Sequence, residues 1–132
     1  LRFDNEVDDI HSDGIQVYLR VPGGTAWGVL VVPDKDGGVR VRPVRDTIAS
    51  AGEVDGAWIP TESGYRISLA IAPSFWDEVR ALRSVEFDLA VNEMRSGRER
   101  RAGQLVWTGG GGWIWLRGDR QAPERFGVLE LE

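Results

Sequence analysis

Two tryptophans separated by a single residue, Trp113 and Trp115, are the strongest candidates for a binding role in this sequence. In an extended strand, residues two apart point to the same face, so the two rings would stand about 6–7 Å apart. Indoles offer a flat apolar surface that suits stacking against a pyranose ring. The alternative is that both rings pack against their own sheet, with the glycine run at 109–112 serving only as a flexible entry loop.

Five polar side chains alternate with apolar ones in three other segments of the chain. They are Gln16, Tyr18, Arg40, Arg42 and Asn92. Because successive side chains of a strand point to opposite faces, these residues would share one polar surface if their strands are neighbours. Amide, hydroxyl and guanidinium groups on such a surface could form hydrogen bonds with the hydroxyls of a sugar. The alternative is an ordinary solvated sheet face.

Carboxylates are concentrated near the start of the sequence, where Asp8, Asp9 and Asp13 are the candidate metal ligands. Calcium prefers hard oxygen ligands of this kind, although the spacing is not that of an EF-hand loop. An acidic loop that holds no metal is the alternative interpretation.

Residues able to form a catalytic set are few. The chain has no cysteine, and its single histidine, His11, lies in the acidic segment, so no nucleophile–base pair stands out. We therefore expect that the protein is not an enzyme. The remaining catalytic hypothesis is a hydrolase or lyase that uses Asp88 or Glu93 on the polar face.

The composition is that of one globular domain, with 132 residues of which 42% are hydrophobic and 28% charged. The net charge of −5 argues against nucleic acid or an anionic membrane as the partner. No apolar run reaches the roughly 18 residues of a membrane-spanning helix. We expect a single domain over residues 1–132 that is a piece of a longer parent chain, because little room is left for a strand before the acidic segment.

Short apolar segments separated by glycine-rich or polar turns predict an all-β fold. The expected strands cover 15–21, 27–32, 39–42, 57–60, 65–72, 87–91, 105–108, 113–117 and 126–131, with a polar hairpin tip at 95–103. Only the segment after Pro73 has helical spacing, with Phe75, Val79 and Leu82 on one side, which predicts one short crossover helix. The expected architecture is an antiparallel β-sandwich or jelly roll.

The order of several segments resembles that of family-9 carbohydrate-binding modules, which have a DOMON-like β-sandwich fold. The similar segments are 13–19 (DGIQVYL), 64–71 (GYRISLAI), 72–76 (APSFW), 87–93 (FDLAVNE), 105–107 (LVW) and 126–131 (FGVLEL). The resemblance implies a non-catalytic accessory domain that binds a poly- or oligosaccharide beside a polysaccharide-acting protein. It also implies a secreted, extracellular or periplasmic location and a structural calcium ion.

In that family a sugar ring is held between two tryptophans, with a carboxylate and amides bonded to its hydroxyls. Here Ile10 stands at the place of the first tryptophan, Gln16 at that of the carboxylate and Ala90 at that of a ligand-binding glutamine. The carbohydrate hypothesis therefore depends on one of the paired indoles for stacking and on the polar face for hydrogen bonds. The rival hypothesis is a structural or protein-interaction sandwich domain that has lost sugar binding.

Overall fold

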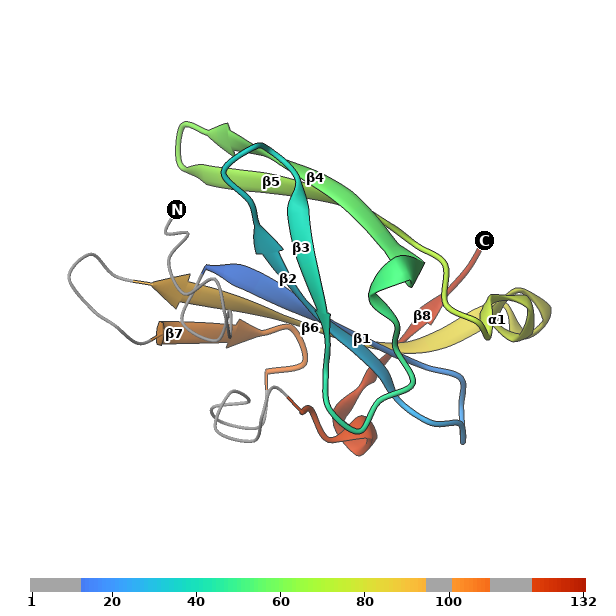
Figure 1. Cartoon of the computed structure of the whole chain (residues 1–132). Coiled ribbons are helices and arrows are strands. Elements are labelled where there is room, and N and C mark those ends of the chain that lie inside the picture. The colour runs from blue at the N-terminus through green and yellow to red at the C-terminus, as the bar shows by residue number, and fades with distance from the viewer. Residues whose placement is uncertain (1–12, 95–100, 110–119) are drawn as a thin grey trace.

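The computed structural model describes residues 13–94, 101–109 and 120–132 (Figure 1). These residues form the strands β1 (Gly14–Arg20), β2 (Trp27–Pro33), β3 (Val39–Pro43), β4 (Val54–Thr61), β5 (Gly64–Ile71), β6 (Ser84–Met94), β7 (Arg101–Val106) and β8 (Gly127–Glu130). They also form helix α1 (Trp76–Leu82) and two 3₁₀ turns, η1 (Ala51–Glu53) and η3 (Pro123–Arg125). The all-β sandwich predicted from the alternation is thus confirmed, and α1 lies where the short helix was expected.

Most of the described strands belong to one antiparallel sheet with the spatial order β3-β2-β1-β6-β7. The short strand β8 joins the same edge of β6 as β7 does, pairing with residues 84–87 while β7 pairs with residues 90–94. The hairpin of β4 and β5 forms the second, smaller sheet. Figure 1 shows this hairpin crossing above the larger sheet, with α1 at one end of the two layers.

The main core lies between the larger sheet and the β4–β5 hairpin. Val17 of β1 and Val29 and Val31 of β2 are buried in it, and Leu69 of β5 and Val79 of α1 contribute from the other layer. These positions alternate along the strands, as expected for the inward face of a sheet. β2 lies between β3 and β1, and its sequence WGVLVVP is buried along the whole length, on both faces of the sheet.

The bounds of several strands, among them β6, β7 and β4, differ from the sequence-based expectation. β7 begins at Arg101, so the predicted hairpin tip at 95–103 was too long, because the main chain of Arg101 already pairs with Met94. β4 begins at Val54, which pairs with Ile71, rather than at Ala57. Polar or small residues can extend a strand in this way because the ladder bonds come from the main chain. The strand expected at 113–117 lies outside the described residues.

Candidate functional site

The five polar residues predicted to share a surface do lie on one face of the larger sheet, which we call the second face. Across the sheet, Arg42 lies opposite Leu30, which in turn lies opposite Gln16. Arg40 lies opposite Val32, and Asn92 opposite Gly14. All of these positions alternate with the core positions, so the prediction that the polar side chains gather on one face is correct.

The amides of the second face are bonded to one another. Asn92 Nδ2 donates a hydrogen bond to Gln16 Oε1 at 3.0 Å, and Gln104 Nε2 donates one to Asn92 Oδ1 at 2.8 Å. Gln16 is completely buried and Asn92 is 2% exposed. A buried and mutually bonded set of amides fixes the register of β1, β6 and β7. In this structure Gln16 and Asn92 are therefore held as structural groups.

Asp88 is a buried carboxylate on the same face, opposite Tyr18. Its Oδ2 accepts hydrogen bonds from Thr108 Oγ1 at 2.9 Å and from Gln121 Nε2 at 2.8 Å. Its Oδ1 accepts bonds from the main-chain nitrogens of Leu89 and Thr108. These bonds tie β6 to the segments that follow β7 and precede η3, and they fix the orientation of the Gln121 side chain.

A cavity of about 520 Å³ opens beside this network, at the end of the second face. It is lined by Tyr18, Ala26, Arg45, Asp46, Thr47, Arg120, Gln121, Ala122 and Pro123. Tyr18 lies behind the lining, since it is only 1% exposed and its ring packs against Phe126 with centroids 5.9 Å apart. The accessible lining therefore consists of arginine, aspartate, threonine and small apolar groups over a rigid aromatic floor.

One wall of the cavity is a tight turn at residues 44–47. Thr47 N donates to Val44 O at 3.3 Å, and Asp46 has a φ of 63°, as the third residue of a type II turn does. Thr47 Oγ1 also donates to Val44 O (2.8 Å) and to Gly28 O (3.2 Å), which anchors the turn to β2. The opposite wall is the segment 120–123, and Arg120 Nη1 bridges the two walls by an ion pair with Asp46 Oδ2 at 2.6 Å.

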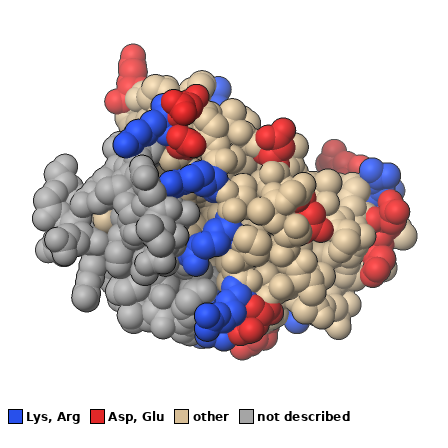
Figure 2. Space-filling model, in the orientation of Figure 1, with Lys and Arg blue, Asp and Glu red and all other residues tan. Residues whose placement is uncertain are grey.

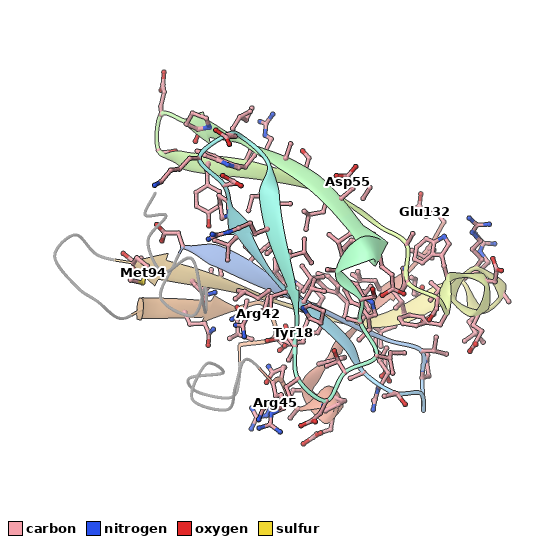
Figure 3. The ribbon with its side chains drawn as sticks, in the orientation of Figure 1. Tyr18, Arg42, Arg45, Asp55, Met94 and Glu132 are labelled. Carbon is pink, nitrogen blue, oxygen red and sulfur yellow. The ribbon has the colours of Figure 1, made fainter. Side chains whose placement is uncertain are left out.

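Arginines continue from this cavity along β3. Figure 2 shows basic side chains in a row along this part of the surface, and Figure 3 shows Arg42 and Tyr18 near the lower end of β3, with Arg45 below them. Arg40 and Arg42 are half-buried, with buried Nε atoms, whereas Arg45 is exposed. Of the predicted polar binding residues, these two arginines of β3 are the ones that still reach solvent.

The tryptophans of the described residues differ widely in exposure. Trp27 is completely buried, and its Nε1 donates to Glu53, whereas the half-buried Trp58 donates to the main-chain oxygen of Asp34. Trp107 is 53% exposed and packs edge-on against Phe87, with ring centroids 5.3 Å apart. The paired indoles predicted to form a stacking platform, Trp113 and Trp115, lie outside the described residues.

Glu53 has a shifted pKa and lies away from the cavity. Burial raises the pKa of its carboxyl group, but three hydrogen bonds outweigh burial and hold the pKa below its usual value. The donors are Trp27 Nε1 at 2.8 Å and the main-chain nitrogens of Ser50 at 2.7 Å and Ser74 at 2.9 Å. Glu53 therefore joins β2, η1 and the segment before α1 as an ionised structural group.

Tyr65 on β5 also has a shifted pKa. Burial raises the pKa of its hydroxyl group, and the nearby negative charge of Asp13 raises it further. Within the described residues the buried hydroxyl has no hydrogen-bond partner. Tyr65 lines a second cavity of about 400 Å³ between β5 and the larger sheet, together with Ile15, Gly64, Ile67 and Val91. This cavity is apolar and lies on the core side of the sheet.

The predicted calcium ligands are only partly described. Asp13 is 9% exposed, and its Oδ1 accepts a hydrogen bond from Met94 N at 2.8 Å, which fixes the start of β1 against β6. Asp8 and Asp9 lie outside the described residues. No group of three or more His, Cys, Asp or Glu side chains that could hold a metal ion occurs in the part of the chain that the structure describes.

The cavity beside Tyr18 was not predicted from the sequence. Its walls come from segments more than 70 residues apart, and no local pattern links Asp46 with Arg120. Comparison with known proteins adds no information, since no family model, curated protein or solved structure matches the chain. Among the helices within 13–94, 101–109 and 120–132, none has the length and apolar character needed to cross a membrane.

Proposed function

We propose that this protein is a non-catalytic carbohydrate-binding domain whose ligand enters the cavity beside Tyr18. The cavity carries this proposal, because its volume of about 520 Å³ lies within the range of small-molecule sites in proteins. Its lining combines polar groups that can bond to sugar hydroxyls, the guanidinium of Arg45 as a donor and the hydroxyl oxygen of Thr47 as an acceptor, with the apolar ring of Pro123. Alternating polar and apolar contacts of this kind suit a pyranose, which has hydroxyls at its rim and C–H groups on its faces.

The rigidity of the lining supports binding rather than chemistry. The turn at 44–47 is anchored to β2, and Gln121 is held by Asp88, so the donors are oriented before a ligand arrives. The carboxylates near the cavity already have partners: Asp46 pairs with Arg120, and Asp88 accepts bonds from several donors. A general acid or base needs a carboxyl group that is free to exchange a proton with the substrate.

The resemblance to family-9 carbohydrate-binding modules adds further proposals. Trp113 and Trp115 remain the candidates for ring stacking, and Arg40 and Arg42 for hydrogen bonds along β3. A secreted, extracellular or periplasmic location, a structural calcium ion and attachment to a longer polysaccharide-acting chain also remain predictions. None of these is needed for the cavity to bind a sugar.

Binding is tested by titrating the ¹⁵N-labelled chain with cello-, xylo-, chito- and uronic oligosaccharides up to millimolar concentration while recording amide shifts. We expect saturable shifts at the turn 44–47 and at Gln121. The variant Thr47→Val should weaken binding, whereas Ser68→Ala on the outer face of the hairpin is the matched control. The absence of shifts at the cavity across all four series would refute the proposal.

A protein-interaction domain is the second candidate, and a specific surface favours it. Leu105 is 72% exposed and Trp107 53% exposed, and both belong to the core side of the sheet next to β6. The β4–β5 hairpin leaves these side chains uncovered. If the double variant Leu105→Ser, Trp107→Ser dissociates a complex or oligomer seen by sedimentation velocity, and no saccharide binds, this second function is the correct one.

A further inference from the structure

The charge of the cavity indicates which saccharides it would select. Among the described residues, the lining contains two arginines, Arg45 and Arg120, and one aspartate, Asp46, which leaves one excess positive charge. The whole chain has a net charge of −5, so the charge of this cavity is opposite in sign to that of the chain. An excess cation in a concave site attracts anionic ligands and repels cationic ones.

The ion pair across the cavity leaves Arg45 as the source of that charge. Arg120 and Asp46 are 2.6 Å apart at their closest atoms and largely neutralise each other. Arg45 is exposed, and it forms no ion pair within the described residues. A guanidinium group presents parallel N–H donors that match the oxygens of a carboxylate or sulfate.

The backbone holds Arg45 in place at the cavity. It is the second residue of the turn at 44–47, between buried Val44 and left-handed Asp46, and Thr47 ties the turn to Gly28 O. The turn therefore loses little conformational entropy when a ligand binds. Figure 3 shows Arg42 next to Tyr18, with Arg45 below both, and Tyr18 and Arg45 line the same cavity.

Asp88 adds a negative charge near the cavity, but Arg40 and Arg42 on the same face of the sheet offset it. Asp88 is completely buried beneath the cavity, and its oxygens accept bonds from Thr108, Gln121 and the main chain. Arg40 and Arg42 lie on the same face of the sheet and extend the basic surface away from the cavity along β3.

We propose that the cavity beside Tyr18 selects saccharides that carry an anionic group, a uronic carboxylate or a sulfate ester, through Arg45. This inference rests on the proposed carbohydrate-binding function and narrows its ligand class. The sugar hydroxyls would face Thr47 and the main chain of the turn, while the anionic oxygens would accept hydrogen bonds from the guanidinium group.

The test compares matched ligand pairs by amide-shift titration of the whole chain at low ionic strength. One pair is trigalacturonate and its carboxyl-reduced neutral counterpart, and the other is a sulfated trisaccharide and its desulfated counterpart. We expect at least one anionic member to bind about tenfold tighter than its neutral counterpart. Arg45→Gln should abolish this preference, so that each anionic ligand and its neutral counterpart bind with equal affinity, and Arg45→Lys should retain part of the preference. Arg66→Gln, an exposed arginine on β5, is the matched control.

The outcomes separate this inference from the function on which it rests. If each anionic ligand and its neutral counterpart shift the cavity residues with equal affinity, and Arg45→Gln changes neither, the anion preference is wrong while carbohydrate binding stands. If no saccharide shifts the cavity residues, both proposals fail. If the anionic preference persists in 0.5 M salt and in Arg45→Gln, Arg45 is not the selecting group and the inference is again overturned.

Discussion

Replacing Glu53 with alanine should destabilise the fold more than its position in a short surface turn suggests. The carboxylate accepts hydrogen bonds from the indole of Trp27 and from the main-chain nitrogens of Ser50 and Ser74. It therefore connects β2 of the larger sheet to η1 and to the segment that leads into α1. Alanine removes the acceptor from all three donors at once.

The size of the stability loss depends on which of the three donors can form a hydrogen bond with water once the carboxylate is removed. Trp27 is 0% exposed, so its N–H group would be left buried without a partner, at a cost of about 1–3 kcal/mol. Ser50 and Ser74 are exposed, so their N–H groups can rehydrate and lose only about 0.5 kcal/mol each. We expect Glu53→Ala to lower the free energy of unfolding by about 2–4 kcal/mol.

Urea denaturation followed by far-ultraviolet circular dichroism measures this loss without relying on Trp27 fluorescence. Glu62→Ala is the matched control, because Glu62 is exposed in the β4–β5 turn and accepts no hydrogen bond within the described residues. The control should change the free energy of unfolding by less than about 0.5 kcal/mol. A loss in Glu53→Ala no larger than in the control would show that the bond to Trp27 does not stabilise the protein.

The pH dependence gives an independent check on the same group. The pKa of Glu53 is lower in the folded than in the unfolded chain, where it is near the ordinary value of 4.5. Its ionised form therefore contributes stability above that value, and the contribution is lost as the pH falls through the folded-state pKa. The stability difference between the wild type and Glu53→Gln should shrink on acidification. A difference that stays constant from pH 7 to pH 3 would refute the assigned pKa direction.

Three further changes test other parts of the structure. Asp88→Asn places an amide donor where Gln121 already donates, and should lower the free energy of unfolding by about 1–3 kcal/mol in urea titrations. Tyr65→Phe should leave the free energy of unfolding at neutral pH equal or higher, because the buried hydroxyl has no partner within the described residues. Since burial raises the folded-state pKa of Tyr65, the wild type should lose stability above about pH 10, and the variant should lose less. Gly28→Ala would bring a Cβ within 2.9 Å of the Tyr18 ring, so thermal denaturation should show a loss of about 1–3 kcal/mol.

Most strands and the helix were predictable because each depends on the spacing of apolar residues within a short segment of the sequence. Alternation at Val17 and Leu19, and again at Val39 and Val41, marks strands whose alternate side chains face the core. The spacing of apolar residues after Pro73 predicted α1 for the same reason. The start of β7 was less predictable, because Arg101 pairs with Met94 through the main chain and carries no apolar signal.

The candidate site was less predictable because polar side chains at equivalent alternating positions can differ widely in burial. Alternation correctly placed Gln16, Asn92 and Arg42 on one face, but it could not distinguish a fully buried amide from a half-buried cation. Burial of Gln16 depends on Asn92, which depends in turn on Gln104 from another strand. Such bonds are set by strand register, which a single sequence does not specify directly.

The uneven size of the two layers gives the domain two chemically distinct surfaces. The hairpin of β4 and β5 covers one side of the larger sheet only in part, so that Leu105 and Trp107 stay exposed there. The cavity with Arg45 lies on the second face, because its floor, Tyr18, points away from the main core. Since the sheet separates these surfaces, substitutions at Leu105 should leave saccharide binding intact, and substitutions at Arg45 should leave protein association intact. A binding role and an interaction role can therefore be tested, and lost, independently.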